Sequence, residues 1–456
     1  MSSDHENQSM LEDFGLTSLP VEWRAPVMGD LIVEDRGISV GVMYPGDHCD
    51  LGIPLIKAGD LKNNWINPKP AFRISPEKHY EYRRTELKGG ELLVSLVGNA
   101  GQIAVVPSPM KGWNAARAIA VVRLSQDADS GYIKYALQSP TLQRLMKSWC
   151  NTTVQETLNL KEIRRLPIPF PPLSEQKAIA HILGTLDDKI ELNRKTNETL
   201  EAMAKALFKS WFVDFDPVRA KAEGRCTGLP AEISDLFPDS FEDSELGEIP
   251  SGWQCCSFTK LVDVISGGTP KTSINEYWNG SIPWFSVVDT PPGSGCWAIQ
   301  TEKRITPEGL ASCSSKLLPT GTTIISARGT VGKVCLAGWD MAMNQSCYGL
   351  RSKAENGEYF CFYLTKSLVE ILEARAHGSV FSTITRDTLD GVATISPSLE
   401  AIQSFNRSTG ALLGKIKTNL EENRILGNQR DALLPKLISG ELRIPDAEKL
   451  LAEVGI

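Results

Sequence analysis

The side chains best suited to chemistry are amides, hydroxyls, arginines and lysines on short loops that contain glycine. Two such loops, around Gly98–Gly101 and Gly329–Gly332, place polar or basic residues beside a pair of glycines. Groups of this kind donate and accept hydrogen bonds, and they can recognise base edges and phosphates. They are not in themselves strong nucleophiles or general bases. The loops therefore indicate recognition rather than catalysis.

Sequence motifs for common catalytic reactions are missing. Gly329–Val334 has two residues between its glycines and no hydroxyl residue after Lys333, so it does not match a phosphate-binding loop. Neither Phe170–Pro172 nor Thr290–Gly293 fits the Asn/Asp/Ser-Pro-Pro-aromatic loop of an amino-methyltransferase. The five histidines are scattered without a His-x-x-x-His pair. We expect this chain to bind no ATP, to transfer no methyl group and to be non-catalytic.

Cysteine usage and hydropathy argue against two further classes of protein. The ten cysteines include no Cys-x-x-Cys pair, and the adjacent Cys255 and Cys256 cannot form a zinc knuckle. We therefore expect reduced thiols and no metal site. No apolar run approaches the roughly 20 residues of a membrane span, and the acidic N-terminus lacks the features of a signal peptide. These features favour a cytoplasmic protein with no membrane partner.

A helical segment that would hold the loops in place occurs twice in the chain, 226 residues apart. Its apolar seam advances in alternating steps of four and three, which is typical of a coiled coil. The first copy of the seam is Ile179, Leu183, Leu186, Ile190, Asn193, Asn197, Leu200, Ala204, Leu207 and Trp211, and the second is Phe405, Thr409, Leu412, Ile416, Asn419, Asn423, Leu426, Arg430, Leu433 and Leu437. The first copy would span about 50 Å as a helix. The repeat predicts two long helices that share one stripe.

Both copies of the seam carry a pair of asparagines, Asn193 with Asn197 and Asn419 with Asn423. A buried amide needs a partner, so asparagine is costly in a dry seam and is useful there because it rejects misaligned pairings. We interpret the four residues as a lock on the register of the two helices. The alternative is an ordinary helical bundle in which the asparagines face solvent.

The repeat continues outside the helices, where loops of unequal length change the offset. Gly90–Gly101 matches Gly321–Gly332, and Asn114 matches Asn344. Short β-branched runs between glycine or proline breaks predict strands, with helical patches between them. The predicted fold class is α+β, with two tandem-repeated mixed α/β lobes separated by two long helices. Since each lobe precedes its own helix, we expect an antiparallel intramolecular coiled coil with a lobe at either end and pseudo-twofold symmetry.

These patterns divide the chain into five segments. We expect a first lobe at 1–170, a first long helix at 171–216, an acidic linker at 217–252, a second lobe at 253–396, and a second long helix with a C-terminal tail at 397–456. Residues 229–250 contain seven acidic residues and no lysine or arginine, so this segment accounts for a net charge of −7 that would otherwise argue against a nucleic-acid partner. The second helix should kink or end at Pro435, and Arg430 should interrupt its seam.

Three motifs carry a resemblance to a known family. Leu166–Gln176, Leu207–Gly224 and Arg430–Leu442 resemble the central region, and its second copy, of specificity subunits from type I restriction-modification enzymes. The resemblance implies two target-recognition domains that each read half of a bipartite, asymmetric double-stranded DNA target. It also implies that the helices set the unread spacer and dock two methyltransferase subunits, through which restriction motor subunits join. S-adenosylmethionine, ATP and magnesium are then expected on the partner subunits, and no cofactor on this chain.

The resemblance makes the polar loops candidate DNA contacts, because short polar side chains and arginines read bases while lysines and amides meet phosphates. In the first lobe the candidates are Lys57, Asn63, Asn64, Asn99, Gln102, Asn114, Arg117, Asn151, Thr152 and Gln155. In the second lobe they are Thr269, Lys271, Thr272, Arg328, Thr330, Lys333, Asn344, Gln345, Thr383, Thr385 and Arg386. We expect Arg328 and Arg386 to read guanines. The alternative function is a two-headed coiled-coil scaffold whose lobes bind protein or carbohydrate ligands.

Overall fold

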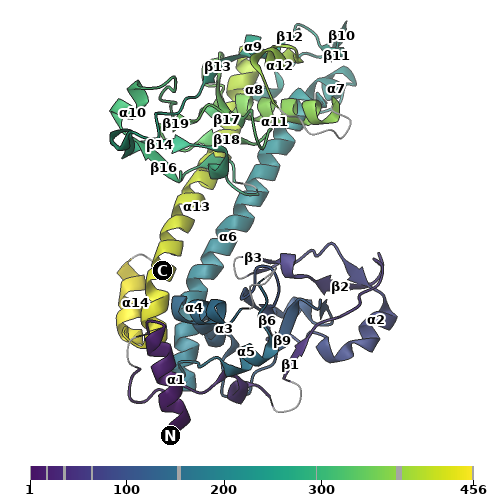
Figure 1. Cartoon of the computed structure of the whole chain (residues 1–456). Coiled ribbons are helices and arrows are strands. Elements are labelled where there is room, and N and C mark those ends of the chain that lie inside the picture. Colours follow the sequence, from purple (N-terminus) through teal and green to yellow (C-terminus); the bar gives the residue numbers. More distant parts are fainter. Residues whose placement is uncertain are drawn as a thin grey trace. The chain divides into compact units, whose positions relative to one another are not determined.

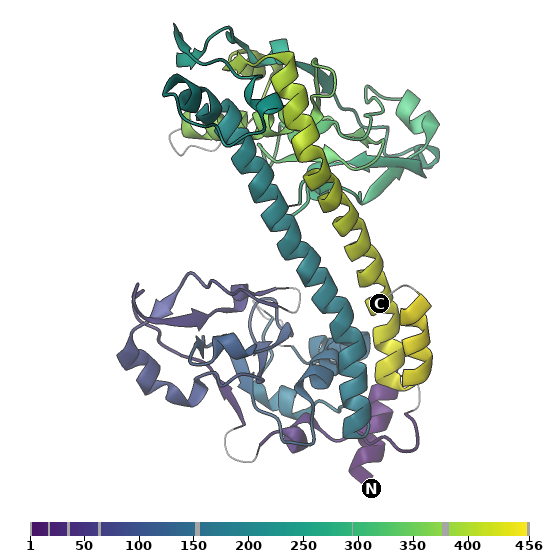
Figure 2. The same cartoon turned by 180° about the vertical axis from the view of Figure 1, so that it is seen from behind.

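The computed structural model describes residues 2–16, 19–33, 37–62, 65–150, 156–293, 295–375 and 383–453. The chain divides into two compact units (Figures 1 and 2). Unit 1 comprises Met1–Lys189 and Ile425–Ile456, and unit 2 comprises Ile190–Arg424. Each unit therefore combines one lobe with a part of both long helices. Within the described ranges, none of the helices has both the length and the apolar character that a bilayer crossing requires.

Unit 1 is built around a four-stranded antiparallel sheet with the order β1-β9-β6-β7. Its strands are β1 (Ile38–Val40), β6 (Leu92–Ser95), β7 (Ile103–Val105) and β9 (Ile119–Val122). Every residue of the central strands β6 and β9 is buried, which explains their nearly continuous apolar sequence. The remaining strands are β2 (Ile53–Ile56), β5 (Arg73–Ile74) and β8 (Asn114–Ala115) in the sheet β5-β2-β8, and the pair β3 (Leu61–Lys62) and β4 (Trp65–Ile66).

The shorter helices of this unit are α1 (Ser2–Asp13), α2 (Pro76–Glu81), α3 (Ser130–Gln138), α4 (Pro140–Trp149), α5 (Leu160–Arg165) and, after the second long helix, α14 (Ile444–Glu453). Three of them, α2, α3 and α4, start at side-chain caps. The Asp129 carboxylate accepts from the Tyr132 amide at the start of α3, and Ser139 caps α4 in the same way. α3 packs on β7 and buries the rings of Tyr132 and Tyr135. The caps therefore fix a helix that connects the sheet to the long helices.

Unit 2 contains a corresponding sheet with the order β13-β20-β17-β18-β15. Its strands are β13 (Val262–Ser266), β15 (Trp297–Ala298), β17 (Thr323–Ser326), β18 (Val334–Ala337) and β20 (Cys347–Ser352). Smaller sheets join β14 (Trp278–Phe285), β16 (Lys303–Ile305) and β19 (Ala342–Met343), β12 (Gln254–Ser257) and β21 (Ala393–Ser396), and β10 (Phe241–Ser244) and β11 (Gly247–Pro250). In the main sheet, β13, β20, β17 and β18 repeat the order of β1, β9, β6 and β7. The tandem repeat predicted from the sequence is confirmed by this order.

The segment 217–252, which the sequence suggested to be an acidic linker, is folded into unit 2. The helices here and in the lobe are α7 (Asp216–Ala222), α8 (Ala231–Ser234), α9 (Phe258–Leu261), α10 (Pro307–Ala311), α11 (Glu358–Arg375) and α12 (Arg386–Asp390). Val218 and Phe237 are 0 % and 2 % exposed and belong to the main core of the unit. The seven acidic residues at 229–250 are exposed, four of them on the β10–β11 hairpin, so the charge pattern indicated exposure but did not reveal the buried apolar residues of this segment.

The two long helices are α6 (Leu173–Phe212) and α13 (Leu399–Ser439), which lie side by side in each unit (Figures 1 and 2). The second helix does not end at Pro435, because α13 continues through the fully buried Leu437 and Ile438. It ends before Gly440, whose φ is +74°. A Cβ atom at this position would lie 2.4 Å from Cγ of Pro20, so glycine is required by both conformation and space.

The asparagines of the seam pair with one another in unit 2. The Asn419 amide donates to Oδ1 of Asn197 over 2.8 Å, and the Asn193 amide donates to Oδ1 of Asn423 over 2.9 Å. Asn193, Asn197 and Asn419 are at most 4 % exposed. Because the residue numbers run in opposite directions, the helices are antiparallel, as predicted. The alternative in which the asparagines face solvent does not agree with this burial, while their effect on register stays a prediction.

Candidate nucleic-acid interface

A tight turn after β17 carries several of the predicted contacts of the second lobe. The Ser326 hydroxyl donates to the Thr330 carbonyl oxygen over 2.6 Å and accepts from the Lys333 amide over 2.8 Å. Gly329 and Gly332 have φ of +78° and +84°, in the left-handed region that favours glycine. The serine and the two glycines therefore fix the turn, while Thr330 and Lys333 remain exposed.

Two segments distant in the sequence are attached to this turn through the backbone. The amides of Ala327 and Arg328 donate to the Ser346 carbonyl oxygen over 2.7 and 3.2 Å. Arg328 also forms an isolated antiparallel bridge with Thr383, and the Ile384 amide donates to the Ala327 carbonyl oxygen over 2.9 Å. The turn after β17, the loop before β20 and the segment before α12 therefore meet at one end of β17.

The loop after β13 joins the same group of loops. The Gly268 amide donates to the Met343 carbonyl oxygen over 3.0 Å, which places this loop beside the end of β19. The Thr269 hydroxyl donates to Oε1 of Gln345. Lys271 is exposed two residues further along. The amide of Gln345 is therefore oriented by a neighbouring loop rather than by its own backbone.

Arg386 ties the start of α12 to β13. Its Nη2 atom donates to the Val264 carbonyl oxygen over 2.9 Å and to the Ser266 hydroxyl over 3.2 Å. The four loops consequently form one surface on the second lobe, which we call the loop surface of unit 2. It contains the candidates Thr269, Lys271, Thr272, Arg328, Thr330, Lys333, Asn344, Gln345, Thr383, Thr385 and Arg386.

Two of these candidates also stabilise their own turns. Oδ1 of Asn344 accepts from the Ser346 amide over 3.0 Å. The Thr385 hydroxyl accepts from the Thr388 amide over 3.1 Å and caps the first turn of α12. Both residues shape the loop surface, and the structure gives them this local role whether or not they contact a ligand.

The first lobe repeats the turn with different side chains. The Ser95 hydroxyl donates to the Asn99 carbonyl oxygen over 2.6 Å and accepts from the Gln102 amide over 2.9 Å. Gly98 and Gly101 have φ of +82° and +84°. Asn99 and Gln102 thus occupy the places that Thr330 and Lys333 hold in the second lobe. The sequence match between the two glycine turns is confirmed at the level of individual hydrogen bonds.

Other candidates of the first lobe have varied positions. Arg117 is exposed on the loop before β9. Lys57 is exposed, but its Nζ atom lies 3.7 Å from the centroid of the Phe72 ring, so its ammonium already has a cation–π partner. The candidates Asn63, Asn64, Asn151, Thr152 and Gln155 lie outside the described residues.

Asn114 was predicted to contact DNA, and the structure contradicts this. The residue is 0 % exposed, its Oδ1 atom accepts from the Thr85 hydroxyl over 2.8 Å, and its amide donates to the Tyr82 carbonyl oxygen over 3.3 Å. The match of Asn114 with Asn344 was also wrong. The parallel ladders place Asn114 opposite Leu55 and Ala342 opposite Trp284, so Ala342 is the counterpart of Asn114. The sequence around a two-residue strand does not differ from that of a loop, so the sequence did not show that Asn114 lies on a buried strand.

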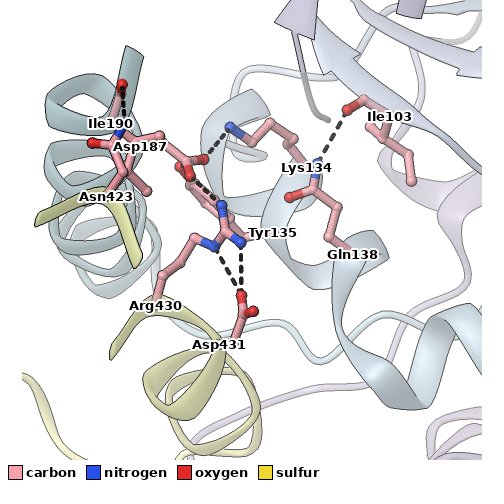
Figure 3. Close-up of polar contacts among 9 residues, drawn as sticks. All are labelled: Ile103, Lys134, Tyr135, Gln138, Asp187, Ile190, Asn423, Arg430 and Asp431. Carbon is pink, nitrogen blue, oxygen red and sulfur yellow. Dashed lines mark hydrogen bonds and ion pairs between the residues drawn. The ribbon is translucent and has the colours of Figure 1, made fainter. Parts of the chain in front are cut away.

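A buried carboxylate that the sequence analysis missed joins α3, α6 and α13 in unit 1 (Figure 3). The Asp187 side chain is 5 % exposed, and it accepts from the Tyr135 hydroxyl over 2.8 Å and the Lys134 ammonium over 3.3 Å. On its other oxygen it accepts from Nη1 of Arg430 over 2.8 Å. Arg430 donates further to Asp431. Arg430 therefore has a partner across the seam, where the sequence had suggested an interruption.

The environment of this carboxylate affects its two neighbours on α3. Burial raises the pKa of the Tyr135 hydroxyl, which therefore stays protonated and donates to Asp187. Burial also lowers the pKa of the Lys134 ammonium, although the nearby Asp187 acts in the opposite direction. The antiparallel pairing of Asn193 with Asn423 places Leu186 opposite Arg430, and Asp187 is the next residue. This register could have predicted from the sequence that Arg430 lies near Asp187.

Comparisons with known proteins agree with this architecture. The model of the type I restriction modification DNA specificity domain matches residues 48–202 and 250–422. The chain therefore belongs to this family of specificity subunits. It is 29 % identical over 332 residues to the Type I restriction enzyme HindI specificity subunit of Haemophilus influenzae, covering 62 % of this chain and 71 % of the relative. It is 25 % identical over 446 residues to the MjaIX specificity subunit of Methanocaldococcus jannaschii, covering 96 % and 98 %.

A solved structure supports the fold. The crystal structure of a type I restriction-modification system S subunit from M. genitalium matches with a TM-score of 0.58 at 15 % identity, over 93 % of this chain and 96 % of that chain. The first matched segment covers most of the first lobe, the second covers the whole second lobe, and each includes part of a long helix. The chain is thus a type I specificity subunit with two target-recognition domains.

Proposed function

We propose that the loop surface of unit 2 and its counterpart in unit 1 read the two halves of a bipartite double-stranded DNA target. The observation that carries this proposal is the convergence of four loops in the second lobe, which places Arg328, Lys333 and Arg386 on one exposed surface. Arginines and amides on such a surface suit base edges, and lysines suit phosphates. Long-range recognition of a polyanion further favours several cations from separate segments.

The two halves of the target should differ. At equivalent places of the glycine turn, the first lobe presents Asn99 and Gln102, whereas the second presents Thr330 and Lys333. An amide pair and a hydroxyl with an ammonium have different hydrogen-bond patterns, so they favour different bases or phosphates. We therefore propose an asymmetric target with an unread gap, and no palindrome.

We further propose that methyltransferase subunits, two in number, dock on the outer faces of the long helices, with restriction subunits attached through them. In unit 2, Leu192 and Met203 of α6 are 58 % and 53 % exposed. They are eleven residues apart, which places them on the same helix face. Large exposed apolar residues on one face are suited to a protein partner. S-adenosylmethionine, ATP and magnesium would then bind to the partners, and this chain would supply specificity without catalysis.

The test is to express the chain with its cognate methyltransferase subunits and a plasmid library that carries a randomised 20-base-pair segment. Long-read sequencing of the library reveals which bases become methylated. We expect a motif of two specified, unlike half-sites at a fixed separation. Methylation without a split motif, or an unchanged motif when this chain is replaced by another specificity subunit, would refute the proposal. Binding of a protein or carbohydrate without any effect on methylation would favour the scaffold alternative.

A further inference from the structure

Two neighbouring positions at the end of the central strand carry an arginine in different lobes, one in the first lobe and the other in the second. Backbone hydrogen bonds at the strand end identify the first position. The Leu158 amide donates to the Leu96 carbonyl oxygen over 2.8 Å, as the Ile384 amide donates to the Ala327 carbonyl oxygen over 2.9 Å. Leu96 and Ala327 are therefore equivalent. The residues that follow them are Val97 in the first lobe and Arg328 in the second.

Isolated bridges support this equivalence. Val97 bridges Thr157, and Arg328 bridges Thr383, both in the antiparallel sense. The same strand extension is therefore present in both lobes, and only the side chain differs. We call the position of Val97 and Arg328 the strand-end position.

The second position lies on the adjacent loop. The Leu96 amide donates to the Ala118 carbonyl oxygen over 2.8 Å, and the Ala327 amide donates to the Ser346 carbonyl oxygen over 2.7 Å. Ala118 and Ser346 are therefore equivalent, and so are the residues before them, which are Arg117 in the first lobe and Gln345 in the second. We call this the loop position.

Each lobe thus has one arginine at these two positions, at the loop position in the first lobe and at the strand-end position in the second. The first lobe has valine at the strand-end position and arginine at the loop position, whereas the second has arginine and glutamine there. Arg117 and Arg328 are exposed, and neither guanidinium forms a hydrogen bond or ion pair with another residue in the described ranges. Among the described residues no carbonyl or carboxylate oxygen engages either guanidinium, so the donors of both side chains suit contact with a ligand.

We infer that the strand-end and loop positions are a specificity-determining pair, an inference that rests on the proposed DNA-reading function. Arg328 and Arg117 each read a guanine in their own half-site, because a guanidinium matches the O6 and N7 acceptors of that base. Gln345 reads the base next to the one contacted by Arg328. Val97, which is half-buried, offers only an apolar contact, as suits a thymine methyl group.

Two other residues position this pair in the second lobe. The Thr269 hydroxyl donates to Oε1 of Gln345 and so restricts the orientation of its side-chain amide. Arg386 donates to Val264 and Ser266 and holds α12 against β13. Leu158 is equivalent to Ile384, so the residue of the first lobe that corresponds to Arg386 is Leu160. The first lobe therefore has no guanidinium at this position. We therefore assign Arg386 a positioning role rather than the reading of a guanine.

The experiment exchanges the pair in the second lobe and reads the resulting motif. The double variant R328V/Q345R gives that lobe the residue pattern of the first lobe. It is expressed with the cognate methyltransferase subunits and the randomised 20-base-pair plasmid library. We expect the half-site read by the second lobe to change at one or two adjacent positions, while the other half-site and the gap stay unchanged. An unchanged motif from an active complex would overturn the inference.

Single variants keep the test decisive if the double variant is inactive. Arg328→Lys retains the charge but cannot form the bidentate contact, so we expect roughly 5- to 150-fold weaker discrimination of guanine from the other bases at one position. Arg386→Lys should lower affinity for target and random DNA alike and leave the motif unchanged. The matched control is Arg351→Ala, because Arg351 is exposed near the far end of β20. Loss of discrimination with Arg351→Ala equal to that with Arg328→Lys would overturn the inference.

The outcome for the unmodified chain separates the two proposals. If it produces no split motif, the DNA-reading function itself fails. If it produces a split motif that Arg328→Lys does not relax at any position, the function stands and the assignment of the pair is wrong.

Discussion

Removal of the buried Asp187 carboxylate should destabilise unit 1 more than any other single charge removal on α6. Its side chain is 5 % exposed, and its partners Lys134 and Arg430 are 13 % and 24 % exposed. Asp187→Ala therefore leaves two cations and the Tyr135 hydroxyl without their acceptor in a poorly hydrated place. Breaking a buried ion pair in this way costs about 3 to 5 kcal/mol. Because Arg430 keeps Asp431 as a partner, we expect the lower end, about 3 kcal/mol.

Differential scanning calorimetry and hydrogen exchange measure this effect. For a unit of this size, about 3 kcal/mol corresponds to a fall of roughly 6 to 12 °C in its melting temperature. Amides of α3 and of residues 425–439 should lose protection, because Asp187 joins these segments to α6. Amides in the core of unit 2 should keep theirs.

The neighbouring Asp188 gives a matched control. It is exposed on the same helix, so Asp188→Ala should change the free energy of unfolding by no more than about 0.5 kcal/mol. Asp187→Asn keeps an acceptor of the same shape but removes the charge, and it should fall between the two. Equal melting temperatures for Asp187→Ala and Asp188→Ala would refute the reasoning that the carboxylate holds three elements together.

Three further predictions concern the seam, a buried thiol and the docking face. Asn419→Leu should cost about 1 to 3 kcal/mol by leaving the Oδ1 atom of Asn197 buried without its donor, and adding Asn197→Leu should recover most of the loss in urea unfolding. Burial raises the pKa of Cys347 from 9.0 to about 12, so the folded state holds more protons than the unfolded state in this window. The contribution of this thiol to the free energy of unfolding is complete below pH 9 and is lost as the pH rises toward 12. Iodoacetamide at pH 8.5 should alkylate Cys347 far more slowly in the folded than in the unfolded protein. Equal alkylation rates would contradict this prediction. Leu192→Glu and Met203→Glu should each weaken methyltransferase binding roughly 10-fold in titration calorimetry, with an unchanged melting temperature, whereas unchanged binding would exclude this face.

Some site residues were identifiable from the sequence because their environment is local. The glycine turns at Gly98–Gly101 and Gly329–Gly332 need left-handed backbone, and the preceding serine always meets the same two backbone groups. The polar residues beside such a turn are exposed in both lobes, with Asn99 and Thr330 as examples. Local conformation was therefore sufficient to place them.

Other residues could not be assigned because their partners come from elsewhere in the chain. Asn114 looked like a loop amide, yet Thr85 and Tyr82 enclose it. Arg386 looked like a reader, yet Val264 and Ser266 engage its guanidinium. Sequence spacing does not show which hydrogen-bond donors already have acceptors, and that decides whether a side chain can meet a ligand.

The sequence by itself determined the duplication, the two long helices and the asparagines in their seam, because helical periodicity relates residues only three or four positions apart. It also determined the family through motifs that surround the first helix and end the second. The tertiary structure alone decided that Arg430 pairs with Asp187 and that Arg117 corresponds to Gln345. These relations depend on which strands and loops become neighbours, and burial and hydrogen bonding between distant segments arise only when the chain has folded.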